Sequence, residues 1–291
     1  MPLRIVAAIC LFSVFPADLV AEGDVTTLLH KAKAEQEAGR IESAIALATR
    51  AVELSPDDVD ARFTRAEIFA GVRQHQQAIA DYTQAMKLNA TSAVLFHRRG
   101  AARFKAGDVV GSIDDFDQEI RLNPRAEKSH WQRGLSYYYA DQFREGQRQF
   151  ELYQTYHASD VENVVWRFAC QAKVDGVEAA RREMLALEEP DRRIPMMKIY
   201  DLFAGKAKPE EVLVVADAGA PAPTEHNVRR FYAHLYLALY YFAIDQAEKG
   251  KDHIFRADRH VISHYMWDVA HVHAQRIKAI KKADTDSSRA P

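Results

Sequence analysis

One constant spacing, the one that separates Ala32 from Ala66, constrains this chain more than any other feature of its 291-residue sequence. Three kinds of position recur at this spacing: a small residue, a mostly aromatic residue and a second small residue. The three columns are Ala32, Ala66, Gly100 and Gly134, then Ala48, Tyr82, Phe116 and Phe150, then Ala44, Ala78, Ser112 and Gly146. A small residue on one helix lets an aromatic ring from a second helix approach closely, so each copy is predicted to be a pair of helices.

Four copies of this helix pair are expected in residues 25–156, and they cover 25–58, 59–92, 93–126 and 127–156. Pro56 and Pro124 follow the second helices of the first and third copies, and proline ends a helix because it cannot continue the hydrogen-bond ladder. One helix pair buries only part of its apolar surface, whereas stacked pairs share a continuous core. The sequence therefore predicts an all-α solenoid of stacked antiparallel helix pairs.

The C-terminal half follows a less regular pattern, since the period is expected to be lost after Tyr156. Residues 157–224 are predicted to form an irregular helical segment, in which 161–174 and 177–187 still read as a helix pair. Residues 225–280 are predicted to form a repeat-like helix pair followed by a capping helix. The end of the chain, 281–291, reads KKADTDSSRAP. This polar composition predicts a disordered tail.

The segment 1–23 is typical of an export signal. Arg4 gives a positive start, residues 5–15 are apolar, and small residues before Asp24 suit cleavage. The apolar run is shorter than the roughly 20 residues that span a bilayer. Cys10 follows Ile9, where a lipoprotein signal needs a small residue. We expect a periplasmic or secreted protein without stable membrane insertion after signal removal; the alternative is a buried first helix, which Pro16 opposes.

Composition and motifs exclude the commonest catalytic and nucleic-acid-binding classes. The formal net charge is -2, so no overall field attracts nucleic acid. The sequence has no phosphate-binding loop, dinucleotide-binding turn, zinc-protease helix, C-x-x-C pair or nucleophile elbow. Cys170 is expected to be a small buried residue. Neither an enzymatic activity nor a cofactor is predicted.

Histidines near the C-terminus offer one alternative, a metal-dependent enzyme. His260 and His264 are four residues apart and could share a helix face, where their ring nitrogens could hold zinc or copper. A third ligand is not obvious, and Asp258 and Asp268 are no more than candidates. We favour surface or capping histidines and expect no bound metal.

The first helices of stacked repeats line a concave surface, and in this chain they carry aromatic residues. The predicted partner-binding groove consists of Phe63, His97, Phe104, Trp131, Tyr138 and Tyr139. Such a surface suits an extended or helical peptide of another protein. The competing interpretation is that these rings are core residues. Part of the rings of Trp131 and Tyr138 is expected to reach the concave side.

The second to fourth copies resemble tetratricopeptide repeats, whose period is about 34 residues. The region from Ala126 to His273 looks like the NlpI-like lipoproteins of the bacterial periplasm. Four blocks carry this resemblance: RGLSYYYADQFREGQRQFELYQ, VVWRFACQAK, IYDLFAGKAKPEEVL and FYAHLYLALYYFAIDQAEKGKDHIFRA. The resemblance implies a helical homodimer that scaffolds murein hydrolases and a periplasmic protease. The missing lipobox departs from that family.

Repeats that bind chaperone tails carry a clamp of lysine and asparagines. The corresponding positions here are Leu29, Lys33 and Thr64, which do not reproduce the clamp. The leading hypothesis is therefore an exported, non-enzymatic scaffold that binds other proteins or peptides and organises cell-envelope enzymes or a protease. The alternatives are the metal-dependent enzyme and a structural homo-oligomer that uses residues 232–242 as its interface.

Overall fold

The computed structural model describes residues 24–287, and side chains as far as residue 282. All regular structure in this part of the chain is helical. The predicted export signal at residues 1–23 lies outside it. The first half contains α1 (Val25–Glu37), α2 (Ile41–Leu54), α3 (Val59–Gly71), α4 (His75–Leu88), α5 (Ala93–Lys105), α6 (Val109–Leu122), the short 3₁₀ helix η2 (Pro124–Ser129), α7 (Trp131–Tyr139) and α8 (Phe143–Gln154).

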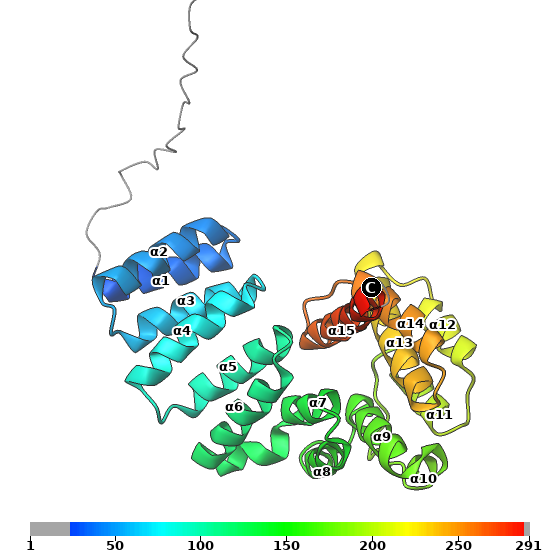
Figure 1. Ribbon diagram of the computed structural model, residues 1–291. Coiled ribbons are helices and arrows are strands. Elements are labelled where there is room, and N and C mark those ends of the chain that lie inside the picture. The colour runs from blue at the N-terminus through cyan, green and yellow to red at the C-terminus, as the bar shows by residue number, and fades with distance from the viewer. Residues whose placement is uncertain (1–23, 288–291) are drawn as a thin grey trace, which may run out of the picture.

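The second half contains seven more helices. They are α9 (Val161–Asp175), α10 (Val177–Arg182), α11 (Met196–Phe203), α12 (Pro209–Asp217), α13 (Pro223–Ala243), α14 (Ala247–Arg259) and α15 (Tyr265–Ser287). Successive helix pairs stack side by side along an arc, and the chain then turns back so that α15 lies in the hollow of the arc (Figure 1). There α15 packs against both α14 and α5.

The small and aromatic columns meet as the sequence predicts. A Cβ atom added at Gly100 would lie 2.8 Å from a ring carbon of Phe116, and one at Gly134 would lie 2.8 Å from a ring carbon of Phe150. Both rings are buried. Each aromatic side chain therefore fills the space that the missing Cβ leaves, and the predicted helix contact is confirmed.

The turn inside each of the first four pairs also repeats. One residue with positive φ occurs in each turn, at Gly39, Arg73, Gly107 and Asp141, and these four positions keep the repeat spacing. This backbone region favours glycine, and an aspartate is tolerated better than most residues. The turn geometry is thus kept where the sequence no longer supplies glycine.

An arginine ladder shows that the repeat register continues beyond Tyr156. Arg65, Arg99, Arg133 and Arg167 follow one another at the repeat spacing, and each guanidinium bonds a side chain 16 residues earlier. These partners are Thr49, Thr83, Asp117 and Glu151. Ala180 likewise continues the column of Gly146 and is buried. The prediction that the period ends after Tyr156 was therefore wrong: α9 and α10 form a fifth pair.

The C-terminal half has the largest hydrophobic core, and it joins α7–α9 to α11–α15. Cys170 is buried in it, as predicted. The helix α15 continues to Ser287, past the predicted end at Ile280, so residues 281–287 are helical rather than a disordered tail. The rest of the predicted tail, 288–291, lies outside the described residues. No proline interrupts them before Pro291. Within residues 24–287, no helix is long and apolar enough to cross a bilayer.

Candidate functional site

The inner surface of the arc is covered in part by the start of α15. The ring of Tyr265 lies between Phe104, with centroids 5.9 Å apart, and Trp131, with centroids 5.0 Å apart. Asp268 accepts ion pairs from Arg73 at 3.2 Å and from Lys105 at 2.9 Å. The last helix is therefore held in the hollow by aromatic packing at one point and by two cations at another.

Three of the predicted groove residues are core residues. Phe104 has no exposed surface, and Tyr138 and Tyr139 are buried. The ring of Tyr138 packs on Phe143 and Trp166, so it does not reach the concave side as expected. The expectation that Tyr138 is partly exposed was wrong because α9 and α15 cover the end of α7 that carries it.

The other three predicted groove residues keep some exposure. Phe63 is half-buried and packs on Tyr82, and His97 is half-buried beside Phe116. Trp131 is half-buried at the mouth of a cavity. Of the two side chains on which the groove hypothesis relied most, Trp131 lines this cavity, whereas Tyr138 lines a separate cavity of about 200 Å³ beside α15.

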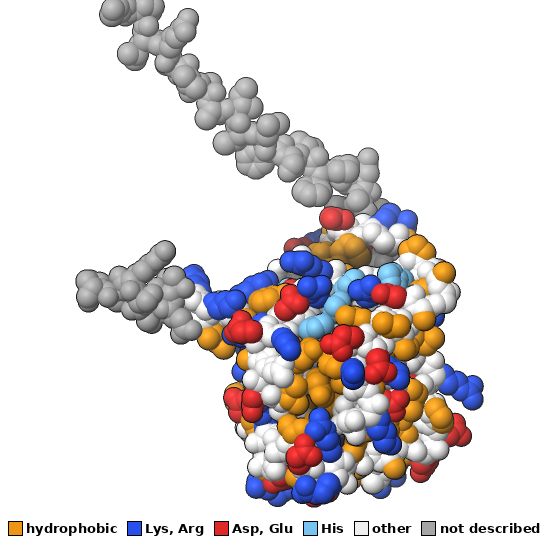
Figure 2. Space-filling model, turned by 90° about the vertical axis from the view of Figure 1, so that its right-hand side faces the viewer, with side chains coloured by type: hydrophobic (Ala, Val, Ile, Leu, Met, Phe, Trp, Pro, Cys, Tyr) orange, Lys and Arg blue, Asp and Glu red, His pale blue; other side chains and the backbone are white. Residues whose placement is uncertain are grey.

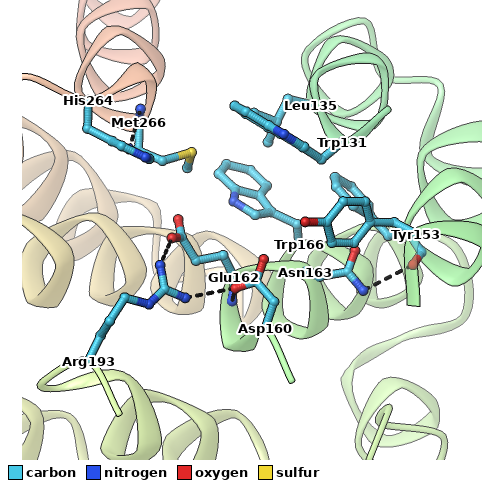
Figure 3. Close-up of a pocket in the computed structure, with 11 residues that line it drawn as sticks. Trp131, Leu135, Tyr153, Asp160, Glu162, Asn163, Trp166, Arg193, His264 and Met266 are labelled. Carbon is cyan, nitrogen blue, oxygen red and sulfur yellow. Dashed lines mark hydrogen bonds and ion pairs between the residues drawn. The ribbon is translucent and has the colours of Figure 1, made fainter. Parts of the chain in front are cut away.

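The cavity beside Trp131 has a volume of about 210 Å³ and lies where α7, α8, α9 and the start of α15 meet (Figure 3). Residues from five segments line it: Trp131, Leu135, Phe150, Tyr153, Asp160, Glu162, Asn163, Trp166, Arg193, His264 and Met266. One wall is aromatic and aliphatic, and the opposite wall is charged. Figure 3 shows Glu162 between Arg193 and the ring of Trp166.

Two buried polar atoms on the α9 wall of this cavity have no hydrogen-bond partner among the described residues. They are the indole Nε1 of Trp166, a donor, and the Oδ1 of Asn163, an acceptor. Trp166 is 2% exposed and Asn163 is 3% exposed. The Nδ2 of Asn163 donates to the carbonyl of Phe150 at 3.1 Å and to Gln154 at 2.9 Å, which fixes the amide orientation. Buried polar atoms are nearly always paired, so these two call for an explanation.

The charged wall is organised by Arg193, which precedes α11. Its guanidinium bonds Asp160 at 2.8 Å, Asp191 at 2.6 Å and Glu162. Glu162 also accepts the hydroxyl of Tyr236. Burial raises the pKa of Glu162 to about 7, although Arg193 acts in the opposite direction. For Glu162 the loss of hydration on burial therefore outweighs the attraction of the guanidinium.

Two further cavities adjoin the central one. A cavity of about 370 Å³ lies between the ends of α3 and α5 and the segment before α15, and it shares His264 with the central cavity. A cavity of about 340 Å³ lies beside residues 189–193 and shares Tyr153, Asp160 and Arg193 with it. The central cavity therefore shares lining residues with each of the other two, and we call the three cavities together the inner groove.

The histidine pair proposed for a metal does not form the predicted arrangement. His260 follows the end of α14 and His264 precedes α15, so the two share no helix face. The Nδ1 of His260 lies 2.9 Å from Asn227 Oδ1, and that of His264 lies 3.3 Å from the hydroxyl of Tyr232. These contacts fit capping and packing roles, and the metal-site geometry expected from the spacing was wrong.

A different trio, His97, Glu119 and His130, does bring three ligand atoms within 4.8 Å of one another. The Nδ1 of His97 and the Nε2 of His130 each lie 2.8 Å from Glu119 Oε2. The Nδ1 of His130, however, accepts the N–H of Arg133 at 3.2 Å and so caps α7. Its Nε2 must therefore carry the proton and donate to Glu119, which leaves no lone pair there for a metal. Burial raises the pKa of Glu119, but donation from His130 and His97 outweighs it and lowers the value to about 2.

The face that carries the C-terminal helices has mixed charge. Lysine and arginine side chains interleave with acidic ones across it, and histidines gather in its upper part (Figure 2). A surface that binds nucleic acid usually gathers its cations in one patch or stripe. The pattern on this face is that of an ordinary solvated surface.

Comparison with known proteins defines the fold. No protein-family model matches the sequence. A tetratricopeptide repeat protein from Parabacteroides merdae is similar in structure, with a TM-score of 0.56 and 13% identity over 85% of this chain and 98% of that one. MamA from Desulfovibrio magneticus RS-1 has a TM-score of 0.51 and 15% identity over 56% of this chain and 92% of that one. The fold is a tetratricopeptide-repeat solenoid. At these identities the likeness shows the fold alone.

Sequence reasoning identified Trp131 but missed the rest of the cavity. Asn163 and Trp166 are three residues apart on a helix predicted at 161–174, so one shared face could have been inferred. Arg193 and Glu162 come from separate segments without a common spacing. Only the folded chain brings them together.

Proposed function

We propose that this tetratricopeptide-repeat protein is a non-enzymatic scaffold that binds a segment of another protein in the inner groove. The observation that carries the proposal is the groove itself: three adjoining cavities, with aromatic walls and unpaired polar atoms in the central one. A continuous groove suits a peptide, which contacts its receptor along its length. Among the described residues that line the central cavity there is no serine, threonine or cysteine to serve as a nucleophile.

We also propose that the scaffold is exported and acts in the periplasm or outside the cell. The pattern of residues 1–23 supports export, and the order of the four sequence blocks supports a role like that of NlpI-like proteins. In that role the partners would be enzymes of the cell envelope or a protease. A homodimer, with residues 232–242 as its interface, is the competing use of the C-terminal half; Phe231 and residues 235–239 are buried within one chain, which disfavours it.

The test is partner capture by purified protein from a periplasmic extract, with Trp131→Ala as the variant. Trp131 lies at the mouth of the central cavity, and a tryptophan in such a position commonly contributes about 2 kcal/mol or more to binding, or about a thirty-fold change in affinity. We expect Trp131→Ala to weaken capture at least ten-fold per folded molecule. Capture is divided by the folded fraction, which is measured by circular dichroism, because Trp131 also packs on Tyr265.

Val214→Ala is the matched control, because Val214 is a 69% exposed apolar residue on α12 away from the groove. It should bind as the unchanged protein does. If Trp131→Ala binds normally per folded molecule, the groove is not the binding surface. A solution mass of two chains with no captured protein would favour the structural homo-oligomer instead.

A further inference from the structure

We propose that the central cavity of the inner groove takes one uncharged residue of the partner segment, with its backbone amide bonded to α9 and an aliphatic side chain against α7. This inference rests on the proposed function and names the part of the partner that the central cavity recognises. It starts from the two unpaired atoms on α9, because a ligand could form the two hydrogen bonds that these atoms lack.

A peptide unit supplies both of the missing hydrogen-bond partners. The indole Nε1–H of Trp166 needs an acceptor, which a peptide carbonyl provides. The Oδ1 of Asn163 needs a donor, which a peptide N–H provides. Asn163 and Trp166 lie one turn apart on α9, and both residues line the cavity. Leaving such groups unpaired away from water is unfavourable, and a peptide in the cavity removes that cost.

The charged wall disfavours a charged ligand. Asp160, Glu162 and Asp191 already share Arg193, so an incoming basic side chain would have to compete with that guanidinium. An acidic side chain would meet three carboxyl groups. The remaining wall consists of Leu135, Phe150 and Met266, all buried and apolar. An aliphatic side chain fits this wall by burial alone.

The size of the cavity limits the ligand to about one residue. Its volume of about 210 Å³ is below the roughly 300–1,000 Å³ of typical small-molecule pockets. Of the lining residues, Arg193 and His264 are exposed and Trp131 is half-buried, so the cavity opens among these three side chains. The rest of a partner segment would continue into the two adjoining cavities.

The indole N–H signals of the full chain in a ¹⁵N–¹H spectrum test this proposal. The chain has three tryptophans, so three indole signals are expected. Two probes are compared: N-acetyl-leucine methylamide, and N-acetyl-lysine methylamide, which has the same amides and a positive charge. The leucine probe should shift the Trp166 signal downfield. Trp267 is the internal control, because its Nε1 already donates to the carbonyl of Asp258 at 3.1 Å, and its signal should stay in place.

Trp166→Phe removes the donor and keeps an aromatic ring, and it should weaken the leucine probe at least five-fold while the Trp267 signal shows that the chain is folded. Tighter binding of the lysine probe would overturn the proposal in favour of a cation site. If neither probe at tens of millimolar moves the Trp166 signal, the proposal is wrong, and bound water rather than a peptide pairs with the two polar atoms of α9. Neither result would change the capture of a partner protein through Trp131. The probe experiment therefore tests the peptide site, and the capture experiment tests the scaffold function.

Discussion

The fourth and fifth helix pairs share one register but pack in opposite ways. In the fourth pair, α7 supplies Gly134 and α8 supplies the ring of Phe150 that fills the space beside it. One repeat later, the position of Gly134 is taken by Phe168, which is fully buried, and the position of Phe150 is taken by Met184. The large side chain has moved from the second helix to the first.

The short length of α10 explains this exchange. It ends at Arg182, so Met184 lies beyond it, and α10 itself brings no aromatic ring to α9. Phe168 packs instead on Phe203 of α11, edge to face, with ring centroids 5.1 Å apart. Arg167 keeps its place in the ladder because its partner Glu151 belongs to α8. A repeat can therefore keep its register while its core is rebuilt, and the loss of the small and aromatic columns hides it in the sequence.

Among the variants that test this difference between the two pairs, Phe168→Ala is expected to lower the free energy of unfolding most. Removing a fully buried phenylalanine side chain costs about 3–5 kcal/mol. Phe168 belongs to the large core that joins α7–α9 to the C-terminal helices, so the free energy of unfolding should fall by an amount in that range. Urea unfolding followed by circular dichroism measures it.

Leu47→Ala is the matched variant in the first pair. Leu47 is also buried, but its hydrophobic cluster contains residues of α1–α3 alone. Hydrogen exchange should show protection lost mainly in α1–α3 for Leu47→Ala, and through α7–α15 for Phe168→Ala. If both variants lose protection evenly over the described residues, α1–α3 and α7–α15 unfold as one cooperative unit, and the expectation that they unfold separately is wrong.

A smaller effect is expected at the reciprocal position, Gly134→Ala. The new Cβ would lie 2.8 Å from the ring of Phe150, closer than a Cβ atom normally approaches a ring carbon, so the ring or the helix would have to shift. Overpacking of this kind costs about 1–3 kcal/mol. The change in the thermal midpoint, followed by circular dichroism, measures the loss.

Gly71→Ala makes the same chemical change where space allows it. Its Cβ would meet only the flexible end of Gln36, at 3.2 Å. Alanine is favoured over glycine in a helix by up to about 1 kcal/mol, so this variant should be neutral or more stable. Equal destabilisation by the two variants would show that the contact with Phe150 is not what requires glycine.

The smallest effect expected is a dependence of stability on pH, to which buried histidines contribute. Burial lowers the pKa of His273 to about 4 and that of His234 to about 3. The Nδ1 atoms of His234 and His253 are 2.9 Å apart, so a second proton there would bring two like charges together. Below about pH 6.5 these histidines bind protons in the unfolded chain but stay neutral in the folded chain. The free energy of unfolding therefore falls as pH falls.

Glu162 acts in the opposite direction. Its raised pKa of about 7 means that the folded state binds a proton more readily than the unfolded state does, so it adds stability as pH falls from about 7 towards 4.5. Urea unfolding at pH 7.5, 6.5 and 5.5 should give a net loss of stability. His273→Phe should reduce the loss, and Glu162→Gln should increase it. An unchanged slope in His273→Phe would show that His273 accepts a proton in the folded chain.

The sequence by itself determined the helix pairs. Contacts such as Gly134 with Phe150, and the ladder of Arg65, Arg99 and Arg133, join residues at most 16 apart within a pair or between neighbouring pairs. A fixed spacing encodes such local contacts, so the fold class and the first eight helices could be predicted from it. The helix pair at 161–174 and 177–187 was predicted, but its repeat register was missed although Arg167 kept the same spacing, because the small and aromatic columns change there.

Only the tertiary structure decided the inner groove. Arg73 meets Asp268, and Tyr139 meets His273, across 195 and 134 residues of chain, and no spacing in the sequence links such residues. Where α15 lies depends on how α11–α14 turn the chain back into the hollow of the arc. That turn buries Tyr138 and Tyr139, leaves Trp131 at the mouth of a cavity, and brings Arg193 to Glu162. Aromatic residues at helical spacing look the same in either role, because burial is a property of the neighbours that folding supplies.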